Sequence, residues 1–556
     1  CKGDYNEEDS VLVDNLTITN GADVTTPSDV NWYNKGDVLV VGNSSHSPKN
    51  LVVQNVSLYS TSHSSNSKAI RINYAQSKIT LNNLLVKTDG ADGVYGSYNV
   101  NNDLQGVFKN LTIESGGSGI YINQGGLQDF ENIAFTLLGN SANDTAIKLQ
   151  YSVADENHIF KHLSFDVGKQ PAIALSSGKQ MTFEDINITA SNYTNNTNAI
   201  AFDYGTTVDD LTFNDINISL NKGTGIEIEQ GNNINVDNCT ISGSTQYAFH
   251  TGSGIDGALT FKNIAFDTNG NYGLLVQEGT DVTIDNATIS GSSGNGWGIK
   301  TDWSVTGSLD FSDVNVTAHA GGIKATQGDN AVFKNVRINS DSSSSNDNGL
   351  EFDSSTFENI TISNCDINAT GNALQVNNAS GTLNVNASKL TTNGNYALYL
   401  KTGVMMAMIE NSCFYNTSSS GNSYAMYLYN WHTISVNNNC IYAPNGGNYA
   451  YASSSHDWDG NYWDGVSDSS GDGAISRDDT TKISTKIVDN NPLTMCQNSC
   501  GGGTNFTLKE CYYDNFNRAS LGERWSIIST GTYPPDITDN KLMLTKKYNN
   551  IASGVS

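Results

Sequence analysis

The chain has 556 residues and a formal net charge of −27 at pH 7, with 56 acidic residues against 29 Lys plus Arg. This excess of negative charge argues against nucleic acid or an anionic membrane surface as a partner. No apolar run approaches the ~18 residues that would predict a membrane-spanning segment. Hydrophobic residues make up 37% of the chain, which is few for a globular protein, so their spacing decides the fold.

Residues 1–50 contain one short run of alternating apolar residues, VLVDNLTI, with Asn15 in its middle. The segment after it carries Trp32 and Tyr33. We expect residues 1–50 to form the first repeat and a cap, because an exposed terminal strand would recruit other strands. Cys1 precedes an acidic stretch, KGDYNEED. It is either a lipidated terminus on an acidic tether or an arbitrary fragment start.

One pattern recurs through residues 51–455: apolar, polar, Asn or Asp, apolar, polar, apolar. In LTFNDINISLNKGTGIEIEQ, residues 211–230, Asp215 separates two alternating runs, and a third run, GIEI, follows a Gly-rich turn. The residue at the bend, after Asn15, is in turn Asn55, Asn83, Asn110, Asn132, His162, Asp185, Asp215, Asn238, Asn263, Asn286, Asp313, Asn335, Asn364, Ala387, Asn411 and Asn438.

From Asn55 on, these bend residues lie 22 to 30 positions apart, in segments with strand periodicity and no helical periodicity. Self-similarity of this kind is typical of a solenoid. A leucine-rich repeat would need a fixed Leu scaffold, which is missing. The sequence therefore predicts an all-β protein, a right-handed parallel β-helix of about 17 coils.

Two side-chain columns are expected to hold the coils in register. Asn at the bend tolerates the left-handed backbone conformation, and its amide can bond to the amide of the next coil. The residue before the bend alternates in sign, as in Lys109, Glu131, Lys161 and Glu184. Opposite charges stacked in neighbouring coils favour this register by a fraction of ~1 kcal/mol per pair.

The best acidic cluster for catalysis is Glu184, Asp185 and Asp215, with His162 one coil earlier. Two stacked aspartates can share a proton or a cation, which is how paired carboxylates become an acid and a base. The alternative, which we favour, is that Asp simply replaces Asn at the bend. No nucleophile elbow, phosphate loop or zinc-ligand spacing occurs in the sequence.

Eight cysteines are present. Cys239 and Cys365 directly follow a bend Asn, so we expect them to be free thiols of the core. Cys413 and Cys440 lie two residues after the bend Asn in successive coils, so both should face outward, ~4.8 Å apart. This separation lies within the Cα range of disulfides and predicts a Cys413–Cys440 bond.

Aromatic residues recur in a column just before the third run of each coil. The column holds Tyr247, Tyr272 and Trp297 in three consecutive coils, with His250 and Lys300 beside them, and later Tyr396, Tyr424 and Tyr449, with Tyr399, Tyr427 and Trp431 beside them. Such rings expose flat apolar faces with polar handles, which is the chemistry that stacks on a pyranose. The alternative is a ladder that only joins coils.

The segment HDWDGNYWDGVSDSSGDGAISRDDTTKISTKIVDNNPL, in residues 456–495, has a different composition. It resembles the closing coil of NosD-type, CASH-domain β-helices, which are pectin-lyase-like. The matching residues are Asn461, Tyr462, Trp463, Gly471, Asp472, Gly473, Asp489, Asn490, Pro492 and Leu493. With the coils, the resemblance covers residues 11–495 and implies the fold. It implies no activity, because the catalytic motifs of the enzymes in that family are not matched.

The same segment predicts a calcium site, because oxygen ligands recur with the spacing of an EF-hand loop. Asp468, Ser470, Asp472, Ala474 and Asp479 occupy positions 1, 3, 5, 7 and 12, and Gly473 occupies position 6. Ser470 is a poor ligand, and Asp479 is one methylene shorter than the usual Glu. The alternative is an acidic turn that is merely solvated.

Residues 496–510 are expected to be a linker, with Cys496, Cys500 and then Cys511 as staples whose pairing the sequence leaves open. Residues 511–556 resemble the opening of the laminin-G-like, concanavalin-like sandwich of MshQ-like proteins in the mannose-sensitive haemagglutinin pilus system. The residues that carry this resemblance are Asp514, Phe516, Asn517, Arg518, Leu521, Gly522, Trp525, Asp539, Asn540 and Leu542. A whole sandwich needs more than ~100 residues, so we expect the natural protein to be longer.

Two classes of function fit these patterns. We favour an extracellular, adhesin-like rod on a cell surface or pilus, secreted through a removed signal sequence, that is structural or binds glycan. Its expected partners are polysaccharide or cell-surface glycan and pilus or other surface proteins, with calcium as the one candidate cofactor. The alternative is a polysaccharide lyase or glycoside hydrolase that uses Glu184, Asp185 and Asp215.

Overall fold

The computed structural model describes residues 10–15, 17–20, 37–41 and 49–497, together with four short strands after residue 526. Within 49–497 the undescribed positions are 61–66, 76, 98–104, 140, 142–143, 154–156, 177, 195, 203–207, 292–295, 342–346, 354–355 and 430–431. The chain divides into two units, Cys1–Phe506 and Thr507–Ser556. The predicted cap residues Trp32 and Tyr33 lie outside the described residues, as do Trp431, Cys1, Cys500 and Cys511.

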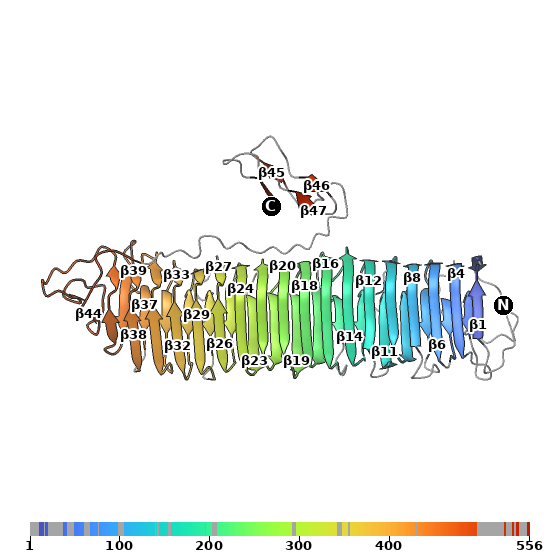
Figure 1. The fold of residues 1–556 in the computed structure, drawn as a ribbon, viewed down its shortest axis with the longest axis horizontal. Coiled ribbons are helices and arrows are strands. Elements are labelled where there is room, and N and C mark those ends of the chain that lie inside the picture. The colour runs from blue at the N-terminus through green and yellow to red at the C-terminus, as the bar shows by residue number, and fades with distance from the viewer. Residues whose placement is uncertain are drawn as a thin grey trace. The chain divides into compact units, whose positions relative to one another are not determined.

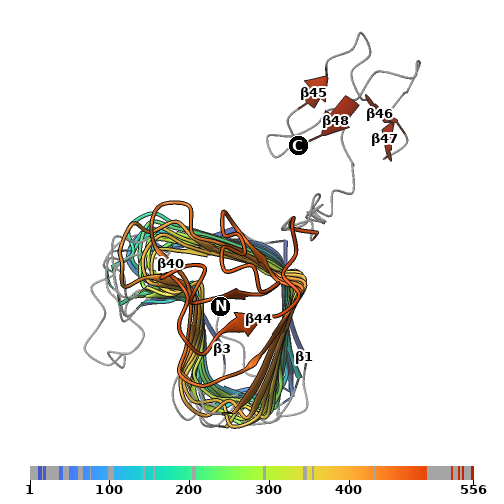
Figure 2. The same cartoon turned by 90° about the vertical axis from the view of Figure 1, so that its left-hand side faces the viewer.

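All regular elements in these described ranges are β-strands. Accordingly, this part of the chain contains no helix long and apolar enough to cross a membrane. In the first unit each coil begins with a strand that bends in its middle and continues with a shorter strand. Figure 1 shows the bent strands side by side along the first unit, and Figure 2 shows the coils one behind another around a common core.

The bent strands that run without interruption are β4 (Asn50–Ser60), β6 (Lys78–Thr88), β8 (Gln105–Ser115), β10 (Gln128–Leu137), β12 (Asn157–Val167), β14 (Gln180–Ala190), β16 (Asp210–Leu220), β18 (Asn233–Ser244), β20 (Leu259–Thr268), β22 (Val282–Ser290) and β24 (Ser308–Ala318). In the other coils two strands flank the bend: β1 (Ser10–Asp14) and β2 (Thr17–Asn20), β26 (Asn330–Lys334) and β27 (Arg337–Ser340), β29 (Asn359–Ser363) and β30 (Asp366–Ala369), β32 (Thr382–Asn386) and β33 (Lys389–Thr392), β35 (Met406–Glu410) and β36 (Cys413–Asn416), and β38 (Thr433–Asn437) and β39 (Cys440–Tyr442).

The shorter strands form what we call the third sheet. Its members are β3 (Leu39–Val41), β5 (Lys68–Ile72), β7 (Asp92–Gly96), β9 (Ile120–Gly125), β11 (Ile147–Val153), β13 (Ile173–Leu175), β15 (Asn198–Phe202), β17 (Thr224–Gly231), β19 (Tyr247–Ile255), β21 (Tyr272–Gly279), β23 (Trp297–Val305), β25 (Gly321–Ala325), β28 (Leu350–Phe352), β31 (Leu374–Val376), β34 (Tyr396–Leu400), β37 (Tyr424–Leu428) and β40 (Asn448–Ala452). Each pairs in parallel with the strand one coil away, as β17 does with β19.

The core is a stack of identical positions from successive coils. Phe183 of β14 pairs with Phe213 of β16, which pairs with Val236 of β18. Along five coils the rings of Phe108, Phe130, Phe160, Phe183 and Phe213 stack with centroids 4.6–5.1 Å apart. Each stacked pair adds ~0.5–1.5 kcal/mol to its burial. The low hydrophobic content is sufficient because only this inward strip has to be apolar.

Seventeen described non-glycine residues have positive φ, between 49° and 56°, and they are the seventeen predicted bend residues from Asn15 to Asn438. The amides of this column bond to one another along the rod. Asn83 Nδ2 donates to Asn55 Oδ1 over 2.7 Å, and Asn286 Nδ2 donates to Asn263 Oδ1 over 2.7 Å. The prediction of the bend column is therefore confirmed, and so is the parallel β-solenoid.

The alternating charges before the bend also meet as predicted. Lys109 Nζ lies 2.7 Å from Glu131 Oε2, and Lys161 Nζ lies 2.6 Å from Glu184 Oε2. These side chains remain roughly two-fifths exposed. Each pair therefore adds less than ~1 kcal/mol to stability, and its main effect is on the register of the coils.

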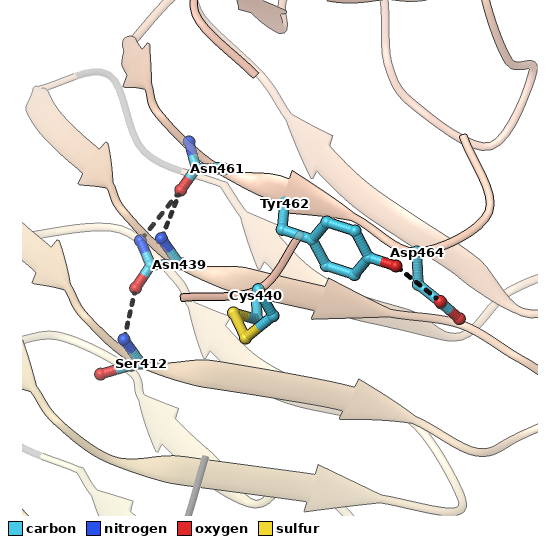
Figure 3. Close-up of a disulfide and its surroundings, with 7 residues drawn as sticks. Ser412, Asn439, Cys440, Asn461, Tyr462 and Asp464 are labelled. Atoms are coloured by element: carbon cyan, nitrogen blue, oxygen red, sulfur yellow. Dashed lines mark hydrogen bonds between the residues drawn. A yellow bond between two sulfur atoms is a disulfide. The ribbon is translucent and has the colours of Figure 1, made fainter. Parts of the chain in front are cut away.

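Toward the end of the solenoid, the position after the bend turns from apolar to polar. Ser412, Asn439 and Asn461 each accept a hydrogen bond from the backbone N–H of the corresponding residue one coil earlier, over 3.0 Å. Figure 3 shows the part of this ladder from Ser412 to Asn461. These bonds tie the last coils together inside the core, where burial makes an unpaired polar group costly.

Residues 456–495, which resemble the closing coil of NosD-type β-helices, close this end. Their strands are β41 (Asp457–Asp459), β42 (Tyr462–Trp463), β43 (Ile475–Ser476) and β44 (Val488–Asp489). Trp458 and Trp463 are almost fully buried in the core cluster. Asp489 accepts hydrogen bonds from Trp463 Nε1 over 2.9 Å and from the Asn461 backbone N–H over 3.0 Å. Burial nevertheless raises the pKa of Asp489. The NYW and DN residues of the resemblance thus have structural contacts that close the core.

In the second unit the described strands form two antiparallel pairs. β45 (Ile527–Ser529) pairs with β48 (Ser553–Val555), and β46 (Asp536–Thr538) pairs with β47 (Lys541–Met543). Of the ten residues that carry the laminin-G-like resemblance, only Leu542 lies in a described strand. That resemblance stays an expectation.

Ala387 offers a test of the bend column, because it alone among the seventeen bend residues has no polar side chain. Its φ of 49° costs an alanine roughly 1–2 kcal/mol, and less for asparagine. We expect Ala387→Asn to raise the free energy of unfolding by about 0.5–1 kcal/mol, and the denaturation midpoint with it. The control is Ala134→Asn, on an exposed and extended position of β10, which should change little. A lower midpoint for Ala387→Asn would contradict this account of the bend.

Candidate functional site

The candidate functional side chains lie on the outer face of the third sheet, because the bent strands present mainly small polar residues. One outward column of the bent strands, for example, holds Thr182, Thr212, Asn235, Thr260 and Thr283. The central outward column of the third sheet, called here the outer column, instead reads Arg71, Tyr95, Tyr121, Lys148, Ala174, Ala201, Glu227, His250, Leu275, Lys300, Lys324, Glu351, Gln375, Tyr399, Tyr427 and Tyr451.

A second column, called here the flanking column, lies three residues earlier on each strand. Tyr247, Tyr272 and Trp297 occupy it in consecutive coils, as predicted, and Gly321 follows. The rings of Tyr247 and Tyr272 stack with centroids 5.7 Å apart at 13°. Desolvation by burial raises the pKa of Tyr247, and Tyr272 and Glu227 nearby add to the shift. Both tyrosines are half-buried and direct a ring face at each other rather than at solvent.

Trp297 lies differently because its neighbour is Gly321. A Cβ at Gly321 would meet three atoms of the indole benzo ring at nearly equal distances, with Cδ2 at 2.5 Å and Cζ3 at 2.6 Å. The ring therefore lies face-on over the glycine, and any side chain there would displace it. Lys324 Nζ lies 5.7 Å from the centre of the ring, which is a cation–π distance.

The charged groups beside Trp297 are already paired. Lys300 Nζ lies 3.0 Å from Asp302 Oδ2. Lys324 Nζ lies 2.9 Å from Glu351 Oε1 and 3.1 Å from Asp353 Oδ2. Burial lowers the pKa of Lys324, but the hydrogen bonds and charges of Glu351 and Asp353 outweigh burial and raise it overall. The result is a row of oriented donors and acceptors at the edge of an aromatic ring.

The second aromatic strip needs one correction. Tyr396 pairs with Tyr424 as predicted, but Tyr424 pairs with Asn448, and Tyr449 is buried in the core, where its hydroxyl donates to the Asp464 carbonyl. The register explains the difference: Tyr449 stands at the position of Ala425, one residue after the flanking column, and this position is buried in both coils. Tyr451 is the outward tyrosine of this coil, and it pairs with Tyr427.

Five tyrosines form this strip: Tyr396, Tyr399, Tyr424, Tyr427 and Tyr451. Their ring centroids lie 4.6–6.2 Å apart, and Tyr427 stacks on Tyr451 at 4.6 Å and 15°. Burial and the neighbouring tyrosines raise the pKa of Tyr427 to about 12. Most ring faces are thus occupied by other rings, which is the arrangement of a ladder that joins coils.

Tyr95, Tyr121 and Tyr451 are not among the predicted site residues, although they stand in the outer column. Arg71 and Lys68 lie 5.5 and 5.3 Å from the Tyr95 ring, and Lys148 lies 5.2 Å from the Tyr121 ring. The sequence signal is the third residue of motifs such as GVYG and GIYI, which is the position that Tyr399 and Tyr427 occupy later.

The predicted acidic cluster is spread over the bend column and its neighbour. Asp185 Oδ2 lies 2.9 Å from His162 Nδ1, Glu184 pairs with Lys161, and Asp215 accepts a hydrogen bond from Asn238 Nδ2. The side chains of His162 and Asp185 are half or more exposed. Each carboxylate therefore has its own ordinary partner, in keeping with Asp replacing Asn at the bend.

The predicted calcium loop closes on its own backbone. Asp468 accepts hydrogen bonds from the backbone N–H of Gly471 over 2.6 Å and of Gly473 over 2.8 Å. Asp479 accepts from the backbone N–H of Ser469 and Ser470 over 2.7 and 2.9 Å. Among the described residues, the ligand atoms of Asp468, Asp472 and Asp479 do not form one of the clusters within 4.8 Å that would suit a metal. Calcium binding by Asp468, Ser470, Asp472, Ala474 and Asp479 stays a prediction.

The predicted Cys413–Cys440 disulfide is wrong in its pairing. Cys413 and Cys440 are in register on β36 and β39, but Cys440 is bonded to Cys496, with the Cα atoms 5.5 Å apart. Figure 3 shows Cys440 beside the polar ladder. Directly stacked residues keep their Cβ atoms near the ~4.8 Å strand spacing, beyond the ~3.5–4.5 Å of a disulfide, whereas Cys496 approaches from outside the sheet.

The other two predictions about cysteines are confirmed. Cys239 and Cys365 are free, fully buried and part of the core. Burial raises the pKa of the Cys365 thiol to about 12, and it raises that of Cys239 as well.

The pairing of Cys440 gives a direct test. In a chymotryptic map of the non-reduced protein, we expect one peptide pair that joins Cys440 to Cys496, because the structure holds these residues at bonding distance. A dominant Cys413–Cys440 cross-link would contradict the structure.

Asp479 gives a test that depends on pH. The hydrogen bonds from the Ser470 and Ser476 backbone N–H groups lower its pKa from 3.8 to about 2. Because the folded-state pKa is the lower one, the ionised carboxylate stabilises the loop above about pH 4 and loses this effect as the pH falls toward 2. We expect the melting temperature of the wild type to fall more steeply over this range than that of Asp479→Asn. The adjacent, exposed Asp478→Asn should behave like the wild type, and equal slopes for all three would contradict the assignment.

Comparison with known proteins agrees with this geometry. Residues 99–256, 251–414 and 305–462 match the family model described as a right-handed β-helix region. Together these segments span residues 99–462, which is more than half of the 556 residues. No curated protein and no solved structure matches the chain. The stacked parallel coils agree with this match, and the chain belongs to the right-handed β-helix family.

Proposed function

We propose that this protein is an extracellular, adhesin-like rod that binds polysaccharide along the outer face of the third sheet without cleaving it. The observation that carries the proposal is Trp297, whose indole lies flat over Gly321. A ring held this way on a rigid sheet, and half-buried, presents an aromatic face to a sugar without having to reorganise. Little conformational entropy is then lost on binding.

The paired charges around Trp297 support recognition of hydroxyl groups. Lys300 with Asp302, and Lys324 with Glu351 and Asp353, place fixed donors and acceptors beside the ring. Both lysines are already paired with carboxylates, which disfavours a polyanion as the ligand at this place. The net charge of −27 also opposes polyanionic glycans. The favoured ligand is therefore a neutral polysaccharide or neutral surface glycan.

An extracellular location is part of the proposal. The Cys440–Cys496 disulfide supports it, because such bonds persist in oxidising compartments. The resemblance of residues 511–556 to pilus-associated proteins suggests pilus or other surface proteins as further partners.

The enzymatic alternative rests on Glu184, Asp185 and Asp215. Their separate ion pairs and hydrogen bonds, and the exposure of Asp185, favour a register role over catalysis. Release of reducing ends or unsaturated products from a panel of polysaccharides by the full chain would overturn the non-catalytic proposal.

Replacing Trp297 with Ala tests the binding face. Loss of one stacked aromatic is worth about 1–1.5 kcal/mol, so we expect retention on the best-binding neutral glycan to weaken about tenfold while the melting temperature stays nearly unchanged. Gly321→Ala should weaken binding as well, because its Cβ displaces the indole.

The matched control is Trp303→Ala. Trp303 lies on the same strand, β23, but it is 59% exposed and its ring does not lie over Gly321. This substitution should leave binding unchanged. A lower melting temperature with unaltered binding in Trp297→Ala would show that the strip only joins coils. Equal losses for Trp297→Ala and Trp303→Ala would indicate nonspecific adsorption.

A further inference from the structure

Glu227, Glu229 and His250 form a compact cluster on the outer face of the third sheet. Glu227 and Glu229 lie on β17, and His250 lies opposite Glu227 on the next strand, β19. One ligand atom from each of the three residues lies within 4.8 Å of the other two. The cluster combines an imidazole with two carboxylates, which is a donor set that transition metals accept.

One ring nitrogen of His250 lies against a carboxylate, and the other is buried. Its Nδ1 lies 3.1 Å from Glu227 Oε1, and the residue is only 7% exposed. Its Nε2 is buried and has no hydrogen-bond partner among the described residues. Nδ1 is thus the nitrogen that lies against Glu227, and it is the atom that would bind a metal ion held jointly with the two carboxylates, in place of its hydrogen bond to Glu227. Either ring nitrogen of histidine can act as a metal ligand.

Glu229 can join the cluster because residue 252 is glycine. A Cβ at Gly252 would collide with Glu229 Oε2, so the absence of a side chain lets this carboxylate reach the strand that carries His250. Glu227 is fixed from the other side by Asn198 Nδ2, which donates to its Oε2. The ring of His250 is fixed by Tyr247, which stacks on it with centroids 4.6 Å apart.

Two other histidine–carboxylate pairs show what an ordinary surface pair looks like in this protein. His162 lies 2.9 Å from Asp185 and His319 lies 2.8 Å from Asp341, with histidine side chains 50% and 63% exposed. Neither belongs to a cluster of three ligands among the described residues. His250 differs from both in its burial and in its second carboxylate.

We propose that Glu227, Glu229 and His250 bind a divalent transition-metal ion of the zinc class. Calcium and magnesium prefer oxygen ligands alone, whereas zinc accepts nitrogen and oxygen together. Three protein ligands leave one position of a tetrahedral ion for water or for an oxygen of a bound molecule. The site is separate from Trp297 and does not depend on the proposed glycan binding.

The test uses the full chain, freed of metal with a chelator and kept oxidised so that Cys440 and Cys496 stay bonded. Zinc chloride is titrated by calorimetry, and cobalt(II) is titrated by absorption spectroscopy to report the ligands. We expect one site in the wild type. His250→Ala and Glu229→Gln should each weaken zinc binding at least tenfold, because they remove a ligand.

The matched control is His319→Ala, which removes an exposed pair and should bind zinc like the wild type. Gly252→Ala should also weaken binding, since its Cβ takes the place of the Glu229 carboxylate. Metal-free melting temperatures show whether each variant is folded, and the near-isosteric Glu229→Gln keeps the test valid if His250→Ala unfolds. No zinc binding by the wild type, or equal binding by Glu229→Gln and the wild type, would overturn the proposal.

Discussion

The structure depends on one backbone constraint that recurs in every coil: a single non-glycine residue in the left-handed conformation. In an L-amino acid this conformation is unfavourable by roughly 1–2 kcal/mol, and asparagine reduces the cost because its amide can bond locally or to a neighbour. In several coils the neighbour is the bend residue one coil away, as for Asn83 with Asn55, and in others it is the residue before that bend, as for Asn110 with Asn82. At these bends the strain is offset by a hydrogen bond that also fixes the register of two coils.

Fixed register turns the sequence into columns, and the columns decide which face has chemistry. Because parallel strands pair residue to residue, an aromatic residue repeated at one offset becomes a continuous strip over many coils, as Tyr247, Tyr272 and Trp297 do. A solenoid of this kind can change its surface one coil at a time without disturbing the core. The bent strands keep small polar residues outside, and the third sheet carries the rings and paired charges.

Much of this could be predicted because the bend is a local signal. The pattern around Asn or Asp identifies all seventeen left-handed residues, including Ala387, and with them the fold, the core thiols and the first aromatic strip. Errors arise where register is counted by spacing alone. The repeat predicts Tyr449 in the flanking column, yet the pairing of β37 with β40 places Asn448 opposite Tyr424 and Tyr449 one residue further along.

The remaining features depend on contacts that no local pattern encodes. Cys496 lies 56 residues after Cys440 and reaches it only because the closing segment folds back on the last coils. The position of the Trp297 ring depends on Gly321 one coil away, and the cluster of Glu229 with His250 depends on Gly252. In the last two cases the absence of a side chain at a glycine creates the site. A sequence pattern that looks for particular side chains does not predict a site that depends on a glycine in the neighbouring coil.

The two aromatic strips show why the same pattern can have different consequences. The second strip consists of Tyr396, Tyr399, Tyr424, Tyr427 and Tyr451, which follow one another without a gap. Each ring packs on the next, so most of the ring faces are covered by other rings. The strip of Tyr247, Tyr272 and Trp297 ends at Gly321. Among the described residues no ring stacks on Trp297, which lies over the glycine instead. An aromatic column joins coils wherever it continues. Only where it is interrupted by a small residue does it leave a flat face for something else to cover.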